Sequence, residues 1–266
     1  MYTHGDVAAL RDALQEGLSI SSAVSRAREA VSGDTNVLAG ALGSYELDRA
    51  ETAMEGAIAL RSVERSVEEV LLPGLQEIGE RHGFDSAPWA FAARWGRDWL
   101  LRAQRLSPPP NRAVTVLIGD ATGGDLEMDA LAMRALELFC SRAGARVLPL
   151  PVSGVSGLAE VITAFSPQAV VIAGASVADD DVARWAYGVR TVSGALPVAL
   201  FRRVSRGRTT GATLLDEGPL EAHRQVLGIV DSQYVSPFAP AAPEVPEAEL
   251  AFDDVVPSVG RRWLQA

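Results

Sequence analysis

The hydrophobic pattern of this 266-residue sequence changes its period at three consecutive prolines, residues 108–110. Before them, over residues 37–106, apolar side chains recur at helical spacing, which predicts a bundle of about four helices. After them, short β-branched apolar runs alternate with helical segments. The strand-like runs cover residues 113–121, 146–152, 169–176 and 197–201, and the helical segments cover 126–144, 158–167, 180–193 and 219–231. Apolar strands that alternate with helices predict a parallel sheet buried on both faces.

The expected fold class is therefore α/β, with an all-α bundle followed by a Rossmann-like, flavodoxin-like doubly wound parallel sheet. Two flanking regions differ in composition from these parts. Residues 1–31 read as two short helices around Gly17, followed by a linker at 32–36. The bundle is assigned to residues 37–106 and the α/β domain to 112–232. Residues 233–266 are rich in proline, alanine and acidic residues, which predicts a disordered tail that ends in a sticky RRWLQA segment.

The charged residues exclude several functions. The chain has 24 basic residues, all of them arginine, against 34 acidic residues. Without lysine there is no Schiff-base chemistry by a protein amine and no ordinary P-loop. The formal charge of -10 argues against a broad nucleic-acid-binding surface. No apolar run is long enough for a membrane span and no signal peptide is visible, so we expect a cytoplasmic protein, with which the single Cys140 agrees.

Polar residues follow the ends of the predicted strands, where open parallel sheets bind ligands. The small-residue loop 119–125 could let a ligand approach the backbone, or it could be a tight turn with Asp125 as a helix N-cap. Residues 179–181 are three aspartates, which could hold a cation or simply begin a helix. Arg202, Arg203, Arg206 and Arg208 could bind an anionic ligand or partner, or could form a solvated loop.

Catalytic motifs are not visible in the sequence. His4, His82 and His223 lack zinc-site spacing, no nucleophile elbow is present, and Cys140 lies in an amphipathic helix. We therefore expect a protein that is not an enzyme.

An aromatic cluster is a better indication of a site. Trp89, Phe91, Trp95 and Trp99 fall within one predicted helix of a chain that is only 6% aromatic. They either pack onto neighbouring helices or provide a flat apolar lid for a planar ligand between the bundle and the sheet.

Three segments resemble MerR-type transcription regulators whose effector half is a cobalamin-binding module. Residues 2–29 resemble the end of the DNA-binding domain, residues 47–83 the four-helix bundle, and residues 116–152 the first βαβ unit of the corrinoid domain. The resemblance extends over about residues 2–232. It implies a bundle joined to a Rossmann-like domain, with the ligand held between them.

The positions that contact cobalamin in that family are changed here. Glu127 stands where the cobalt-binding histidine is expected, and a carboxylate is a poor replacement for imidazole nitrogen. His82 occupies the position where the family has a signature tryptophan, and Ala90 and Phe91 occupy the positions of a glutamate-histidine pair. The family motif that lines the nucleotide tail corresponds to residues 176–178, where only its serine, Ser176, is kept. The pair of glycines that makes room for the tail in the family is replaced by larger residues near Phe201, Arg202 and Arg203. The resemblance thus implies the architecture without standard cobalamin binding, and bulky side chains in the tail channel.

The sequence predicts a ligand cavity between bundle and sheet. Its candidate residues are His82, Trp89, Phe91, Trp95, Thr122, Asp125, Glu127, Ser176 and Phe201. We expect the effector half of a MerR-like regulator, which senses a small molecule, a planar cofactor or a regulatory protein and acts through a homo-oligomer. The cofactor stays unknown; cobalamin is possible, with Glu127 in place of its lower ligand. Specific DNA binding would need a DNA-binding domain that this sequence lacks. The alternatives are a corrinoid protein that carries methyl groups or senses light, and a ligand-free interaction scaffold.

Overall fold

The computed structural model describes residues 33–154, 156–203 and 211–233, which all belong to one compact unit. The expectations for residues 1–31, for the tail beyond residue 233, and for Arg206 and Arg208 lie outside the described residues. No helix of the described part is long and apolar enough to cross a membrane.

The predicted helical bundle is present. It consists of a helix over 33–43, α3 (Leu47–Leu60), α4 (Val63–Ser66), the π-helix η1 (Val67–Leu71), α5 (Leu72–His82) and α6 (Ala87–Arg105). Helix α6 begins with a pattern that favours a helix start, because the Ser86 side chain accepts a hydrogen bond from the Trp89 backbone N–H and Pro88 occupies the first turn. The prediction of a linker at 32–36 is wrong from residue 33 on. There Asp34 and Thr35 bond to other residues of the bundle.

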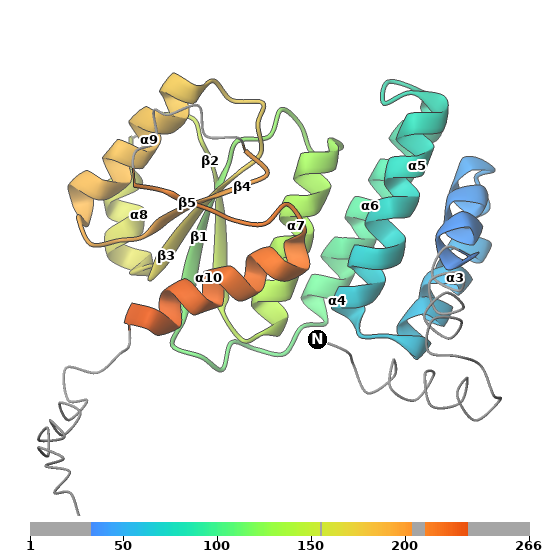
Figure 1. Cartoon of the computed structure of the whole chain (residues 1–266), viewed down its shortest axis with the longest axis horizontal. Coiled ribbons are helices and arrows are strands. Elements are labelled where there is room, and N and C mark those ends of the chain that lie inside the picture. The colour runs from blue at the N-terminus through green and yellow to red at the C-terminus, as the bar shows by residue number, and fades with distance from the viewer. Residues whose placement is uncertain (1–32, 155, 204–210, 234–266) are drawn as a thin grey trace, which may run out of the picture. The chain divides into compact units, whose positions relative to one another are not determined.

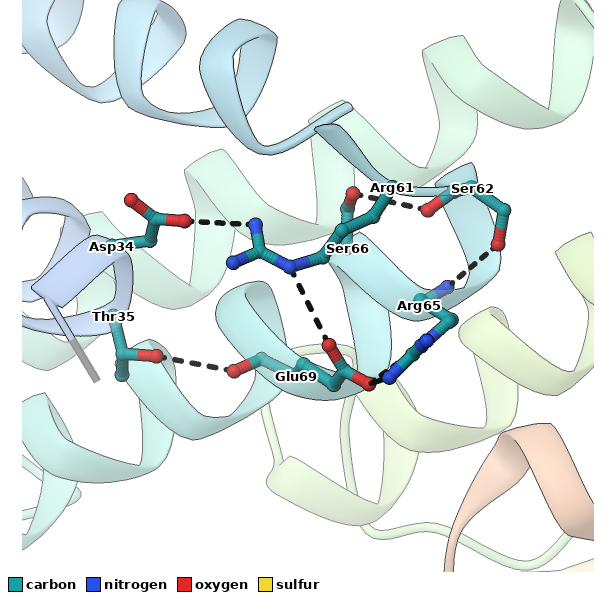
Figure 2. A network of polar contacts seen from close by, with 7 residues as sticks. All are labelled: Asp34, Thr35, Arg61, Ser62, Arg65, Ser66 and Glu69. Atoms are coloured by element: carbon teal, nitrogen blue, oxygen red, sulfur yellow. Dashed lines mark hydrogen bonds and ion pairs between the residues drawn. The ribbon is translucent and has the colours of Figure 1, made fainter. Parts of the chain in front are cut away.

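A partly buried polar network makes these bonds (Figure 2). Arg61 lies at the end of α3, where its guanidinium pairs with Asp34 at 2.8 Å and with Glu69 at 3.5 Å. Glu69 also pairs with Arg65 at 2.5 Å, and its carbonyl accepts a hydrogen bond from the Thr35 hydroxyl at 3.1 Å. The network therefore fastens the first turns of the helix over 33–43 to η1.

The sheet has five parallel strands in the order β2-β1-β3-β4-β5. Its strands are β1 (Thr115–Asp120), β2 (Arg146–Pro151), β3 (Ala169–Ala173), β4 (Val198–Phe201) and β5 (Thr213–Leu214). This is the flavodoxin-like order, so the predicted fold class is confirmed. The sequence did not predict β5, which has only two exposed residues and no apolar run.

Helices cover both faces of the sheet. They are α7 (Met128–Arg142), α8 (Leu158–Phe165), α9 (Asp179–Val192) and α10 (Pro219–Gln233). Figure 1 shows α7 and α10 on one face and α8 and α9 on the other. Alternate strand residues enter two separate cores: Val171 packs beneath α7 and α10, and its neighbour Ile172 packs beneath α8 and α9. Both faces are buried, which explains the continuous apolar runs in the sequence.

Helix α7 joins the bundle to the sheet (Figure 1). One side of it, with Leu131 and Phe139, packs into the bundle core, and another side, with Met133 and Cys140, packs onto the sheet. Helix α7 is thus buried by the bundle on one side and by the sheet on the other, and its first residues lie between the bundle and the α/β half.

The sheet-facing position of Cys140 predicts an unreactive thiol. The side chain is completely buried, and this burial, together with the nearby charge of Glu137, raises the pKa of the thiol to about 12. Only the thiolate is an efficient nucleophile. We expect the native protein to resist a disulfide reagent such as DTNB at pH 8, whereas the urea-unfolded chain reacts with one equivalent. Rapid labelling of the native protein would contradict this placement.

Candidate functional site

The strand order reverses between β1 and β3, and two loops meet outside the carboxyl ends of these strands. The β1–α7 loop contains Gly123 and Glu127, and the β3–α9 loop contains Ser176. The Glu127 carboxylate accepts hydrogen bonds at 2.9 Å from the Gly123 backbone N–H and at 2.9 Å from the Ser176 hydroxyl. Glu127, not Asp125, occupies the N-cap position of α7, so the predicted cap is wrong. The chain turns for two further residues before the helix begins.

A cavity of about 500 Å³ lies between this loop and the bundle, and we call it the bundle-side cavity. It is lined by Phe84, Trp89, Gly124, Asp125, Leu126, Glu127 and Met128. Trp89 is only 4% exposed, and its ring packs edge to face against Phe84 with centroids 4.9 Å apart. The cavity therefore has an aromatic wall on the bundle side and backbone with carboxylates on the other side.

The other predicted site residues lie elsewhere. Phe91 is half-buried and packs against Tyr45, and Trp95 is buried in the bundle core. Phe201 is completely buried under α10 and α7 in the sheet core. His82 is exposed at the end of α5.

Thr122 belongs to the same β1–α7 loop and bonds to Asp120 at the end of β1. Its backbone N–H and its hydroxyl both donate to the Asp120 carboxylate, at 2.9 and 2.6 Å. Of the candidate set, the structure thus brings Trp89, Asp125 and Glu127 together around one cavity, with Ser176 hydrogen-bonded to its edge.

A second cavity of about 550 Å³, the edge cavity, opens beside Ser176. It is lined by Asp129, Ala175, Ser176, Val177, Ala178, Asp179, Arg202, Arg203, Leu214, Leu215 and Glu217. Arg202 pairs with Asp129 at 2.7 Å and donates to the Glu217 carbonyl at 3.3 Å. Arg203 is 6% exposed and donates to the carbonyls of Gly174 and Val177 and to Asp179. The reading of these two arginines as a solvated loop is therefore wrong, because internal acceptors hold both side chains.

The three aspartates at 179–181 form the first turn of α9. Asp179 pairs with Arg203, and Asp181 pairs with Arg184 one turn later at 3.1 Å. In the described part of the chain, no group of three His, Cys, Asp or Glu side chains is placed to hold a metal ion. Negative charge at a helix start is a sufficient physical account of these residues.

The bundle is fastened to the α/β half most firmly at the end away from the bundle-side cavity. Glu64 pairs with Arg142 at 2.6 Å, and Glu68 of η1 accepts a hydrogen bond at 3.2 Å from the Leu220 backbone N–H at the start of α10. Burial raises the pKa of the Glu68 carboxyl, and the charges of Asp216 and Glu69 add to this effect. Beside the cavity, Arg97 and Asp125 are 3.6 Å apart, a longer and more exposed pair.

Three side chains that line the bundle-side cavity were not among the site residues predicted from the sequence. Phe84 lies in the turn between α5 and α6, Leu126 lies in the β1–α7 loop, and Met128 begins α7. Phe84 could have been noticed because it is a large apolar residue in an otherwise polar turn directly after Gly83.

No family model and no curated protein sequence matches the chain. Solved structures do match. A novel cobalamin-binding protein from Desulfitobacterium hafniense DCB-2 is 12% identical with a TM-score of 0.37, and the match covers 73% of this chain and 98% of that one. A methanol:cobalamin methyltransferase complex from Methanosarcina barkeri is 13% identical with a TM-score of 0.36, and the match covers 87% of this chain and 93% of that one. At these values the matches carry no argument about a ligand.

The side chains present do not fit a corrinoid whose cobalt is bound by a protein imidazole. No histidine is among the described residues that line either cavity, and the Glu127 carboxylate is already engaged by Gly123 and Ser176. A carboxylate is also a weaker match than imidazole for this metal. What the bundle-side cavity offers is an aromatic wall and a backbone floor, which suit the faces and edges of a planar ring.

Proposed function

We propose that this chain is a ligand-binding module that takes a large planar ligand, with a corrinoid ring as the first candidate, into the bundle-side cavity. The ring is held by contacts with the Trp89 and Phe84 wall and with the β1–α7 loop, and the protein supplies no imidazole to the metal. Cobalamin is the first class to try because the segments 47–83 and 116–152 resemble a corrinoid-binding module.

One observation carries this proposal. The cavity of about 500 Å³ lies at the switch in strand order, where open α/β sheets bind ligands, and an aromatic pair closes it from the bundle. Its size falls within the usual range for ligand sites, and it combines apolar walls with few polar groups.

We further propose that the module senses its ligand and performs no reaction, as the effector half of a MerR-like regulator. This step rests on the resemblance of residues 2–29 and 47–83 to that family. A ligand that widens the space between α6 and the start of α7 would shift the bundle on the α/β half, and this shift is the signal that we propose.

The test uses two corrinoids, hydroxocobalamin and diaquocobinamide, the second of which has the same ring without the nucleotide arm. The full chain is incubated with each and separated by gel filtration. We expect about one equivalent of ring per chain to be retained in at least one case, as for a single preformed cavity. The visible bands of bound diaquocobinamide should stay those of the water-ligated ring, because no histidine is among the described residues that line the cavity.

Retention of neither ring would overturn the corrinoid proposal and favour an interaction scaffold. A shift of bound diaquocobinamide to the bands of imidazole-ligated cobalt would contradict the absence of a protein ligand. The test variant is Trp89→Phe, which keeps an aromatic ring but shortens the wall of the cavity. Its matched control is Trp185→Phe, the same change in the core beneath α8 and α9. Only the first change should weaken retention.

A further inference from the structure

A hydrogen bond joins the lining of the bundle-side cavity to the lining of the edge cavity. Glu127 lines the first cavity and Ser176 lines the second. The Ser176 hydroxyl donates to Glu127 Oε2 at 2.9 Å. This pair is therefore a wall between two cavities of about 500 and 550 Å³.

The wall is tightly built. The backbone N–H of Gly123 donates to the same Glu127 oxygen, so the carboxylate is held from both loops. A β-carbon on Gly123 would lie 2.4 Å from Glu127 Oε1 and 3.1 Å from the Ser176 β-carbon. The β1–α7 and β3–α9 loops therefore approach closely here, and the end of the Glu127 side chain fills the space between them.

Beyond the wall, the edge cavity is poorly suited to an anion. The two cations among its described lining residues are engaged, Arg202 by Asp129 and Arg203 by Asp179 and two carbonyls. Asp129, Asp179 and Glu217 all line the cavity. A phosphate that entered would meet three carboxylates and would have to break existing ion pairs to gain an arginine.

We infer that Glu127 and Ser176 are specificity-determining residues, which restrict the bundle-side cavity to planar rings that carry no long anionic arm. This inference rests on the proposed function, because it concerns the ligand of the same cavity. Hydroxocobalamin carries a nucleotide arm with a phosphodiester, and its ring can lie flat on the β1–α7 loop only if the arm goes elsewhere. Diaquocobinamide lacks the arm and has no such requirement.

The test is equilibrium dialysis of the full chain against each of these two rings. We expect the wild-type protein to bind diaquocobinamide at least about tenfold more tightly than hydroxocobalamin, as exclusion by a fixed wall requires. Glu127→Ala opens the wall, so the ratio should fall to about threefold or less, through tighter binding of hydroxocobalamin. Ser176→Ala removes one bond but leaves the carboxylate, and should give an intermediate ratio.

Two controls separate the wall from general effects. Glu127→Gln keeps the size of the side chain and an acceptor oxygen, and should keep most of the preference. Glu160→Ala makes the same change as Glu127→Ala at an exposed glutamate in the first turn of α8, and should leave both affinities unchanged. Circular dichroism of each variant checks that the fold is kept, which is expected because Glu127 is exposed.

The outcomes distinguish a failure of the specificity role of Glu127 and Ser176 from a failure of the proposed function. Equal binding of both rings by the wild-type protein, or an unchanged ratio in Glu127→Ala, would overturn the role of the wall while the proposed function stands. Failure of every variant to bind either ring would overturn the proposed function and this inference with it.

Discussion

Replacing Phe139 by alanine is expected to lower the free energy of unfolding by about 3 to 5 kcal/mol, the usual cost of removing a buried phenylalanine. The ring is 1% exposed and belongs to the bundle core, although it lies on α7. It also packs edge to face against His223 of α10, with centroids 5.8 Å apart. One side chain thus joins the bundle, α7 and α10, and its loss leaves a cavity where three elements meet.

Urea unfolding followed by circular dichroism measures this loss. The control is Leu106→Ala, at an apolar residue that is 83% exposed just after α6, and it should change the stability by less than about 0.5 kcal/mol. A loss below about 1 kcal/mol for Phe139→Ala would mean that the bundle does not pack on α7 as described.

Replacing Gly174 by alanine is the second change with a large expected effect. Gly174 follows β3 with φ +96, and an added β-carbon would lie 2.9 Å from the Thr122 backbone nitrogen and 3.0 Å from the Ala121 carbonyl carbon. The left-handed conformation alone costs about 1 to 2 kcal/mol, and the clash with backbone adds about 1 to 3 kcal/mol. We expect a total loss of roughly 2 to 5 kcal/mol in unfolding free energy.

Gly154 is a matched control for this change, because it has φ +79 and nothing within 4 Å of an added β-carbon. Gly154→Ala should show the conformational cost alone. The difference between the two variants measures how closely the β1 and β3 loops approach at the candidate site. Equal losses would contradict that close approach.

Much of the fold could be predicted from the sequence because its main signals are local. Strands buried on both faces leave continuous apolar runs such as residues 113–121, and the Ser86 cap with Pro88 marks the start of α6. The errors fall where stability comes from distant partners. Residues 33–36 have the composition of a linker, but the ion pair between Asp34 and Arg61 holds them in the bundle. Strand β5 is recognised only by its pairing with β4.

The candidate site was predicted only in part for the same reason. Trp89 and Glu127 were singled out by composition and by the family resemblance. Phe84 contributes to the cavity only because the turn between α5 and α6 brings it against Trp89. The internal pairing of Arg203 depends on carbonyls that lie 26 and 29 residues away along the chain. No local pattern records such contacts.

The most direct test of the central claim is a crystal structure of the full chain grown with diaquocobinamide. The ring should lie in the bundle-side cavity, between Trp89 and the β1–α7 loop, with the Glu127–Ser176 hydrogen bond intact and no protein side chain bound to the cobalt. A ring bound at any other surface, or a histidine found on the metal, would contradict the proposed binding of the ring in this cavity.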